Sequence, residues 1–595
     1  MMLKPLRAKA KQHQQIARPF SIPAPTKGWY VGENLASAPP KTAFYLQNVF
    51  PQLDYVRVRR GAQEWATGMT SAVVESLMVY SNAGVDAMFA GCGGRIYDVS
   101  NTGAVGSAKV SGLGNATFQY TQFTGLGGSY LVCVNGADGA QRFDGTNWNK
   151  TYSVTATTTS GNPTITSVSS VTGLIAGQAI SGTGIPANTF IGTVGASTIG
   201  LVNASGSAVN ATASNVGVAI TVYQSPPITT TTGAIFSDVH TYKNRLYFVE
   251  RNSLNLWYLD TYAIGGAATK FPMQGIFKDG GTIIAIDDWA VDSTSGIYSG
   301  FCVITSEGEV AMYDGLDPSS WGLKGVYRIS RPLGARCKMK AGGDLLIGTE
   351  DGIVPMSKVE TLDQVALQNV AVTLPIAPAW RQAVLDRAGQ TGWQITPWSI
   401  ESMGVVNLPK KDTGDRTQYV VNERTGAWSL YFGWDANCFA VFGNKLFYGA
   451  SDGRVMQAEV GAADDGGNYT AIIFCSFDAL NGAATRKDVR LIRAFTQANV
   501  SFSWSIAINV DFDTAIPNAP TVVLPSSSGA KWDVAVWDVD VWPATLTNSA
   551  VWQMVPAYGS LLAPVLQTRL SSASLTPDIR LTQIDLLYEE GNLIG

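Results

Sequence analysis

The chain has 595 residues, which is too long for one compact core and indicates several domains. Charged residues make up 14% of it, against roughly 25% in a typical soluble protein, and glycine is abundant, as is typical of an all-β protein with many turns. The net charge of −4 argues against a protein that grips nucleic acid through clustered lysine and arginine side chains.

Residues 1–27 form a basic arm. Its first 20 residues contain five lysines and arginines and no acidic residue. Because no apolar segment follows the arm, we expect no secretory signal. Because the sequence has no run of about 18 or more apolar residues, we expect no membrane-spanning helix. The arm is predicted either to lack fixed structure or to become ordered against a partner subunit.

A distinctive pattern occupies residues 28–61. It begins with Gly-Trp and Asn-Leu-Ala, continues through Pro-Pro and an Asn-x-Phe-Pro, and ends in a strand with alternating arginines and Arg-Arg-Gly. The residues that carry the pattern are Gly28, Trp29, Asn34, Leu35, Pro39, Asn48, Phe50, Pro51, Val56, Arg57, Arg59 and Gly61. It resembles the opening of the tail nozzle or tail hub proteins of short-tailed bacteriophages, a family also called tail tubular protein B. The alternative is the opening of a generic β-domain.

One phrase occurs twice along the chain. Residues 242–248 read YKNRLYF and residues 442–448 read FGNKLFY, and each continues through a polar turn into another apolar strand. A strand, a Gly/Asn/Asp turn and a second strand predict a β-hairpin. Looser versions occur at 86–99, 129–144 and 344–356. This recurrence favours a β-propeller, which we place at 71–150 and 238–460, with short helices at 363–368 and 379–389.

Residues 151–237 contain no Asp, Glu, Lys or Arg. Valine, isoleucine and leucine alternate there with threonine and serine between Gly and Pro turns, which predicts short strands with a core of their own. We therefore expect a small uncharged β-sandwich inserted in a propeller loop, where chain ends already lie close together.

Longer strands are expected in residues 461–595. Within them, the segment 531–542 reads KWDVAVWDVDVW, and its apolar phase flips from one strand face to the other, which indicates a bulge or bend. Runs of Trp and Asp of this kind also resemble the C-terminal part of phage nozzle proteins. The aspartates Asp533, Asp538 and Asp540 carry oxygen ligands but lack the spacing of a calcium loop, so we interpret them as strand residues.

The sequence offers little catalytic chemistry. It has two histidines, His13 and His240, and we expect a structural role for His240. The six cysteines lack metal-binding spacing and are interpreted as small buried residues in a protein without disulfides: Cys92, Cys133, Cys302, Cys337, Cys438 and Cys475. No zinc, phosphate-loop or dinucleotide motif is present. We therefore predict no catalytic, cofactor-binding or metal-binding residues and no enzymatic activity.

The predicted fold is all-β: a propeller interrupted by the inserted β-sandwich, with a platform built from residues 28–70 and 461–595. The resemblance implies a virion protein, assembled in the host cytoplasm, that forms a homohexameric tail ring. The expected partners are the head-to-tail adaptor, tail fibre or needle proteins, and double-stranded DNA that passes through the bore without specific binding. The ring would serve as a conduit and gate for genome ejection, and the uncharged insert would lie at its periphery.

A second function stays open from the residues alone. A tail-associated propeller that binds or hydrolyses glycans needs only two carboxylates, and Asp287, Asp288, Asp314 and Asp317 could pair in space. The segment FDGTNW at 143–148 is the nearest match to the Asp-box of sialidase-type propellers, but it occurs once and is better explained by a hairpin turn.

Overall fold

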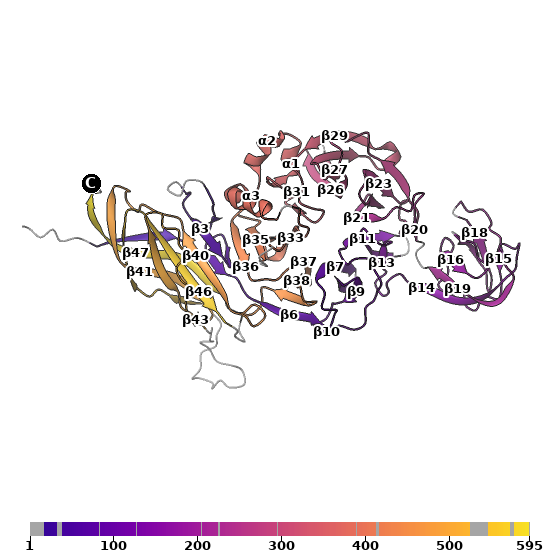
Figure 1. Ribbon diagram of the computed structural model, residues 1–595, viewed down its shortest axis with the longest axis horizontal. Coiled ribbons are helices and arrows are strands. Elements are labelled where there is room, and N and C mark those ends of the chain that lie inside the picture. Colours follow the sequence, from indigo (N-terminus) through magenta and orange to yellow (C-terminus); the bar gives the residue numbers. More distant parts are fainter. Residues whose placement is uncertain are drawn as a thin grey trace, which may run out of the picture.

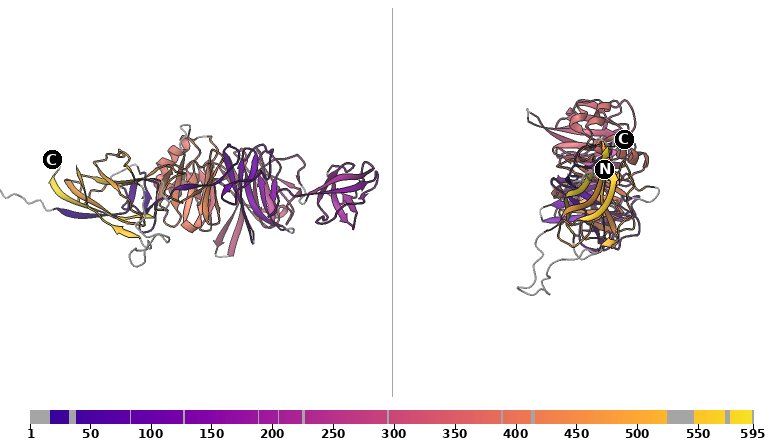
Figure 2. Two further views of the ribbon diagram at one scale, coloured as in Figure 1. Left: turned by 90° about the horizontal axis from the view of Figure 1, so that it is seen from below. Right: turned by 90° about the vertical axis from the view of Figure 1, so that its left-hand side faces the viewer.

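A computed structural model describes most of the chain. The described residues are 17–32, 38–82, 84–125, 128–187, 189–203, 205–223, 227–293, 296–387, 389–411, 416–523, 546–571 and 576–593. The molecule is elongated: a two-sheet platform lies at one end, the propeller in the middle and the uncharged insert at the other end (Figures 1 and 2). The fold is all-β, as the composition predicts, with three short helices in the described part of the chain.

Seven sheets surround the propeller axis in the described residues. The first contains β7 (Val74–Asn82), β8 (Val85–Cys92) and β9 (Arg95–Asp98), and the second contains β11 (Gln119–Gly125), β12 (Gly128–Val134) and β13 (Gln141–Phe143). The third contains β21 (Phe236–Tyr242), β22 (Arg245–Glu250), β23 (Asn255–Tyr258) and β25 (Thr269–Pro272). The next two contain β26 (Ile283–Ser293), β27 (Gly296–Thr305), β28 (Glu309–Asp314), β29 (Gly322–Arg328), β30 (Lys338–Ala341), β31 (Asp344–Thr349) and β32 (Gly352–Pro355).

The last two sheets both include or pair with strands from residues 28–70, the stretch predicted to belong to the platform. The sixth contains β33 (Gln394–Trp398), β34 (Met403–Asn407), β35 (Thr417–Asn422) and β36 (Trp428–Phe432). The seventh contains β37 (Cys438–Phe442), β38 (Lys445–Gly449), β39 (Val455–Ala458), β6 (Ala62–Thr67) and β10 (Gly103–Ala104). Strand β6 was expected in the platform but completes this propeller sheet by pairing with β39.

The ring of sheets closes on itself. The first strand of each sheet packs against a strand of the next sheet, and β37 of the seventh sheet packs against β7 of the first. The closing sheet combines β37–β39 with β6, which precedes β37 by more than 350 residues. An N-terminal strand that completes the final sheet ties the two ends of the propeller together.

The repeated phrase forms two hairpins, as predicted. YKNRLYF lies at the turn between β21 and β22, and FGNKLFY at the turn between β37 and β38. Both central residues have positive φ in each turn: Lys243 (43°) and Asn244 (62°) in the first, Gly443 (53°) and Asn444 (63°) in the second. This is the type I′ geometry that matches strand twist. The repeated phrase therefore forms the same type of turn in two different sheets.

The insert is a small all-β unit with its own core, as predicted, and its six strands are hydrogen-bonded in one continuous order. Its strands are β14 (Thr151–Thr158), β15 (Thr164–Ile165), β16 (Ala179–Gly182), β17 (Thr189–Val194), β18 (Ile199–Val202) and β19 (Asn215–Tyr223). A bridge between Thr157 and Thr166 brings the two edges of the sheet together around an apolar core. The uncharged sequence continues to Ser237, but β20 (Ile228–Thr229) already pairs with β24 (Gly266–Ala267) outside this sheet.

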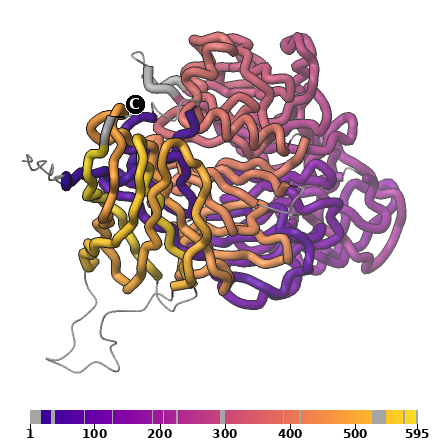
Figure 3. Tube along the Cα trace, turned by 60° about the vertical axis from the view of Figure 1, so that its left-hand side comes forward, coloured from indigo at the N-terminus to yellow at the C-terminus, as the bar shows by residue number. Residues whose placement is uncertain are grey.

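The platform combines strands from both ends of the chain (Figure 3). One sheet contains β1 (Arg18–Pro23), β4 (Val49–Pro51), β5 (Val56–Val58), β41 (Thr485–Ala498), β44 (Thr547–Ser549), β45 (Gln553–Gly559) and β47 (Ile579–Leu593). The other contains β2 (Gly28–Trp29), β3 (Thr42–Gln47), β40 (Tyr469–Cys475), β42 (Ser505–Val510), β43 (Val522–Val523) and β46 (Leu562–Leu570). Strands β2 and β3 also pair in parallel with β36, so the second sheet continues into the sixth propeller sheet.

Short helices connect the fifth and sixth propeller sheets. They are α1 (Met356–Val359), α2 (Gln364–Leu367) and α3 (Ala377–Leu385). Of these, α2 lies within the stretch predicted at 363–368, whereas α3 overlaps the stretch predicted at 379–389 but begins two residues earlier. Trp380 of α3 is buried and donates a hydrogen bond to the Thr349 carbonyl, which fixes the helix on the fifth sheet.

We predict that the insert can be removed without unfolding the propeller. Thr151 and Tyr223 are paired neighbours on β14 and β19, so a short Gly-Ser linker can replace residues 151–223. The main unfolding transition measured by calorimetry should move by less than about 4 °C, because about 1 kcal/mol shifts a domain of roughly 150–250 residues by about 2–4 °C and a larger unit by less. Loss of a cooperative transition would show that the insert is part of the propeller's folding unit.

Candidate functional site at the junction of propeller and platform

A fully buried arginine lies where the propeller meets the platform. Arg59, between β5 and β6, has no exposed surface. Its Nη1 and Nη2 donate to Oδ1 and Oδ2 of Asp464 at 2.7 and 2.5 Å, and Nη2 also donates to the Phe432 carbonyl of β36 at 3.0 Å. The guanidinium lies 4.1 Å from the ring centre of Tyr469 on β40. One side chain therefore contacts both sheets that meet at the junction.

Asn48 completes this buried network. Its Oδ1 accepts from Nε of Arg59 at 2.8 Å and from the Phe432 amide at 2.9 Å, and its Nδ2 donates to the Thr470 carbonyl at 2.9 Å. Asn48 has φ of 55°, a left-handed conformation that asparagine adopts more readily than most residues. The amide thus holds the chain between β3 and β4 against both β36 and β40.

Two glycines of the same sequence pattern allow backbones to touch at the junction. A Cβ on Gly28 would lie 2.6 Å from the backbone of Trp428, and Gly28 has a positive φ of 84°. A Cβ on Gly61 would lie 2.0 Å from the Ala463 carbonyl oxygen. Any side chain at either position would push the platform away from the propeller.

A second buried arginine lies beside the first. Arg57 of β5 has its Nη2 3.4 Å from carboxylate oxygens of both Glu459 and Glu401. Burial alone would lower the pKa of Arg57, but the nearby Glu459 outweighs it and raises the pKa above its ordinary value. The alternating arginines of the sequence pattern are thus both charged and both neutralised inside the protein. Asn34 and Leu35 of the pattern lie outside the described residues.

The inner strands of three propeller sheets carry a second charged cluster. It consists of Asp238, His240, Asp287, Asp288, Lys338 and Lys340, on β21, β26 and β30. His240 Nε2 and Lys340 Nζ both lie close to Oδ1 of Asp288, at 2.7 and 2.6 Å. Burial alone would raise the pKa of Asp288, but the hydrogen bonds from His240 and Lys340 hold it well below its ordinary value. His240 is thus part of a network of charged side chains that joins three propeller sheets.

This cluster is better suited to ion pairing than to metal binding or catalysis. His240, Asp287 and Asp288 place potential ligand atoms within 4.8 Å of one another. However, the Lys340 ammonium already lies where a cation would sit, and Lys338 is 3.2 Å from Asp287. Two lysines thus offset the charge of the carboxylates without any added ion.

The other candidate carboxylates also lie beside basic side chains. Asp317 pairs with Arg245 at 2.5 Å, whereas Asp314 lies 3.9 Å from Lys243 and 3.8 Å from Lys324. In FDGTNW, Oδ1 of Asp144 accepts from the Thr146 and Asn147 amides, so this segment forms a turn. These contacts do not bring together the two free carboxylates that glycoside hydrolysis requires.

The cysteines are buried and unpaired, as we expected. Burial raises the pKa of Cys438 to about 11, so its thiol stays protonated near neutral pH. The Trp-Asp segment 531–542, with Asp533, Asp538 and Asp540, lies outside the described residues, as does most of the basic arm. Of residues 1–27, the described part includes β1, which pairs with β47 of the same chain. No helix in the described part of the chain is long and apolar enough to cross a membrane.

Comparisons with known proteins identify no family for this chain. No protein-family model and no curated protein matches the sequence. The computationally designed Ika8 protein matches with a TM-score of 0.33 and 11% identity over 67% of this chain and 100% of its own. YCF48 from Cyanidioschyzon merolae (TM-score 0.26, 10% identity, 67% and 99% covered) and BBS1N in complex with ARL6DN (0.25, 9%, 68% and 99%) also match. The chain is an all-β propeller protein, and these similarities extend no further than the fold.

We predict that Arg59 is essential for stability. Arg59→Met leaves Asp464 buried without its partner, which should lower the free energy of unfolding by about 3–5 kcal/mol in urea denaturation. The control is Arg18→Met, which breaks the surface pair with Glu590 and should cost less than about 1 kcal/mol, since Arg18 is 52% exposed. Equal effects of the two substitutions would contradict the role of Arg59.

The charged cluster predicts a loss of stability in acid. The folded pKa of Asp288 lies below its unfolded value of about 3.9, so its contribution is present above about pH 4 and disappears as the pH falls further. Asp288→Asn should therefore flatten the fall in unfolding free energy between about pH 4 and 2. Asp260→Asn, at a side chain that is 92% exposed, serves as the control and should follow the parent curve. An unchanged slope for Asp288→Asn would show that the ion pairs do not stabilise the propeller.

Proposed function

We propose that this chain is a tail nozzle subunit of a short-tailed bacteriophage. Six copies would form a ring through which double-stranded DNA leaves the virion without specific binding. The observation that carries the proposal is where the nozzle-like sequence pattern lies. Trp29, Asn48, Phe50, Arg57 and Arg59 are all buried at the junction of propeller and platform. The resemblance thus involves the residues that join the two parts, which an isolated propeller would not need.

The elongated shape supports a defined orientation in the ring. The platform and the insert occupy opposite ends of the molecule, with the propeller between them (Figure 1). We place the platform against the head-to-tail adaptor and the insert at the far end, where tail fibre or needle proteins would dock. The first sheet of the platform includes strands from both chain ends, so a load on it reaches the propeller through several connections.

The platform also carries an apolar surface that suits contact between neighbouring subunits. On and beside the edge strand β45, Met554 is 81% exposed, and Val551, Trp552 and Tyr558 are exposed as well. A closed ring requires a contact between two different surfaces of adjacent copies. Exposed aromatic and methionine side chains are typical of such contacts.

The carboxylate geometry favours this structural role over glycan hydrolysis. The four aspartates considered for catalysis lie close to lysine, arginine or histidine side chains, which compete for the oxygens a sugar-hydrolysing pair would use. We therefore propose a protein without enzymatic activity. Its assembly would take place in the host cytoplasm and its final place would be the virion tail.

Native mass spectrometry and negative-stain microscopy test the ring. The purified chain of 63.2 kDa should assemble into particles of about 0.4 MDa with a central opening, alone or with its adaptor ring. A monomer or trimer under both conditions would contradict the proposal. Clearance of host polysaccharide by such a species would support the alternative of a glycan-degrading propeller.

The proposed contact surface can be tested separately. Met554→Asp places a charge on the exposed platform edge and should reduce ring formation at least about ten-fold, as judged by the ring-to-monomer ratio. The matched control is Val216→Asp, at a residue of the insert that is 86% exposed. Unchanged ring formation by Met554→Asp would move the subunit contact to another surface.

A further inference from the structure

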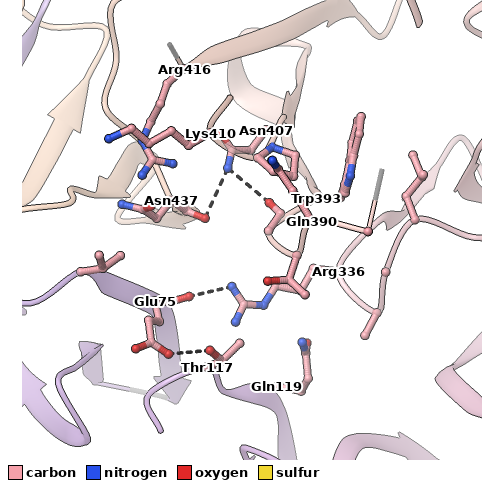
Figure 4. A pocket seen from close by; sticks show the side chains of 18 residues that line it. Glu75, Thr117, Gln119, Arg336, Gln390, Trp393, Asn407, Lys410, Arg416 and Asn437 are labelled. Atoms are coloured by element: carbon pink, nitrogen blue, oxygen red, sulfur yellow. Dashed lines mark hydrogen bonds between the residues drawn. The ribbon is translucent and has the colours of Figure 1, made fainter. Parts of the chain in front are cut away.

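A cavity of about 780 Å³ opens at one end of the propeller channel. Its wall includes Glu75 and Gln119 at the starts of β7 and β11, Arg336 just before β30, Trp393 just before β33 and Asn437 just before β37. Residues from five of the seven sheets thus meet at this mouth (Figure 4). The volume lies within the roughly 300–1,000 Å³ that is usual for small-ligand sites.

Arg336 is a cation of this wall whose buried donors are not all satisfied. Its Nη1 donates to the Glu75 carbonyl at 2.8 Å, whereas Nη2 is buried and has no hydrogen-bond partner in the described part of the chain. No carboxylate oxygen of the described residues lies within 4.0 Å of its guanidinium nitrogens. Burial lowers the pKa of Arg336, which reflects the cost of keeping this charge away from water. An anion at the mouth of the channel would offset that cost.

The remaining charges leave room for an anion. Glu75 supplies the single carboxylate among the described residues of the wall, and its Oε2 already accepts from Thr117 Oγ1 at 2.6 Å. Arg416 is fully engaged, because it donates to Asp435, the Ala436 carbonyl and Ser451. Lys410 is exposed at the cavity and adds positive charge without a fixed partner among the described residues.

The other polar groups indicate what kind of anion would bind. Amide side chains of Gln119, Asn407 and Asn437 line the cavity together with the apolar Leu333, Trp393 and Pro409. The Gln119 amide has no side-chain hydrogen bond within the described residues. Amides both donate and accept, so they match hydroxyl groups, whereas a phosphate only accepts. Apolar walls with a few polar groups suit the alternating faces of a sugar ring.

We propose that the mouth of the propeller channel binds a carboxylated sugar, with Arg336 holding the carboxylate and Gln119 a hydroxyl group. The site binds and does not hydrolyse, because the described wall has one carboxylate where glycoside hydrolysis needs two. Its natural ligand would be a uronate unit of a surface polysaccharide. The proposal is independent of ring formation, since every residue of the site belongs to one propeller.

Isothermal titration of the full chain with cellobiouronic acid and with cellobiose tests the proposal, since these disaccharides differ only in the carboxylate. The acidic sugar should bind at least about ten-fold more tightly, which corresponds to about 1.4 kcal/mol. Arg336→Gln should abolish this preference. The matched control, Arg331→Gln, changes an arginine that is 62% exposed on the same loop and should preserve the preference.

A second variant separates recognition from folding. Gln119→Ala should weaken both sugars by a similar factor, because it removes a contact to a hydroxyl group and not to the carboxylate. Thermal unfolding of each variant shows whether the propeller is intact. The proposal is overturned if the parent chain fails to bind cellobiouronic acid, if it binds both sugars equally, or if a folded Arg336→Gln keeps the preference. Stronger binding of inorganic phosphate than of the acidic sugar would also overturn it.

Discussion

The bidentate pairing of Arg59 with Asp464 is the interaction on which the arrangement of the molecule depends. Burying a guanidinium costs free energy unless its hydrogen-bond donors are satisfied and its charge is neutralised. Here the partners come from the segment after β39, from β36 and, through Asn48, from β40. The propeller and the platform must therefore keep one relative position, because separating them would leave the charge uncompensated.

Strand pairing reinforces the same connection. The sixth propeller sheet continues into the platform through β2 and β3, and the seventh is completed by β6, which directly follows the Arg59 segment. The propeller therefore closes, and the platform attaches to it, through adjoining segments of the same chain. A subunit built in this way can transmit force between its two ends, as the proposed role in a tail conduit would require. The propeller channel, by contrast, contains an ion-pair network and a mouth with one unsatisfied arginine.

Local features of this fold could be predicted from the sequence, whereas long-range ones could not. The hairpins at Asn244 and Asn444 follow from turn chemistry within seven-residue phrases. The partners of Arg59 were not predictable, because Asp464 lies 405 residues further along the chain. The channel cluster likewise joins His240, Asp288 and Lys340 from three sheets. The cavity at Arg336 joins residues that lie at or next to strands of five sheets, which no local sequence pattern predicts.

With Arg59 and Asp464 paired across the junction, the propeller and the platform should form one rigid body. Pulsed electron–electron double resonance measures the distance between two spin labels, here attached at Asn101→Cys in the propeller and Ala483→Cys in the platform. The native cysteines are all buried, so the labels should react with the two introduced thiols. We predict a single narrow distance distribution, unchanged when the chain assembles. A broad or two-peaked distribution in the unassembled chain would show a hinge at the junction and would contradict the account.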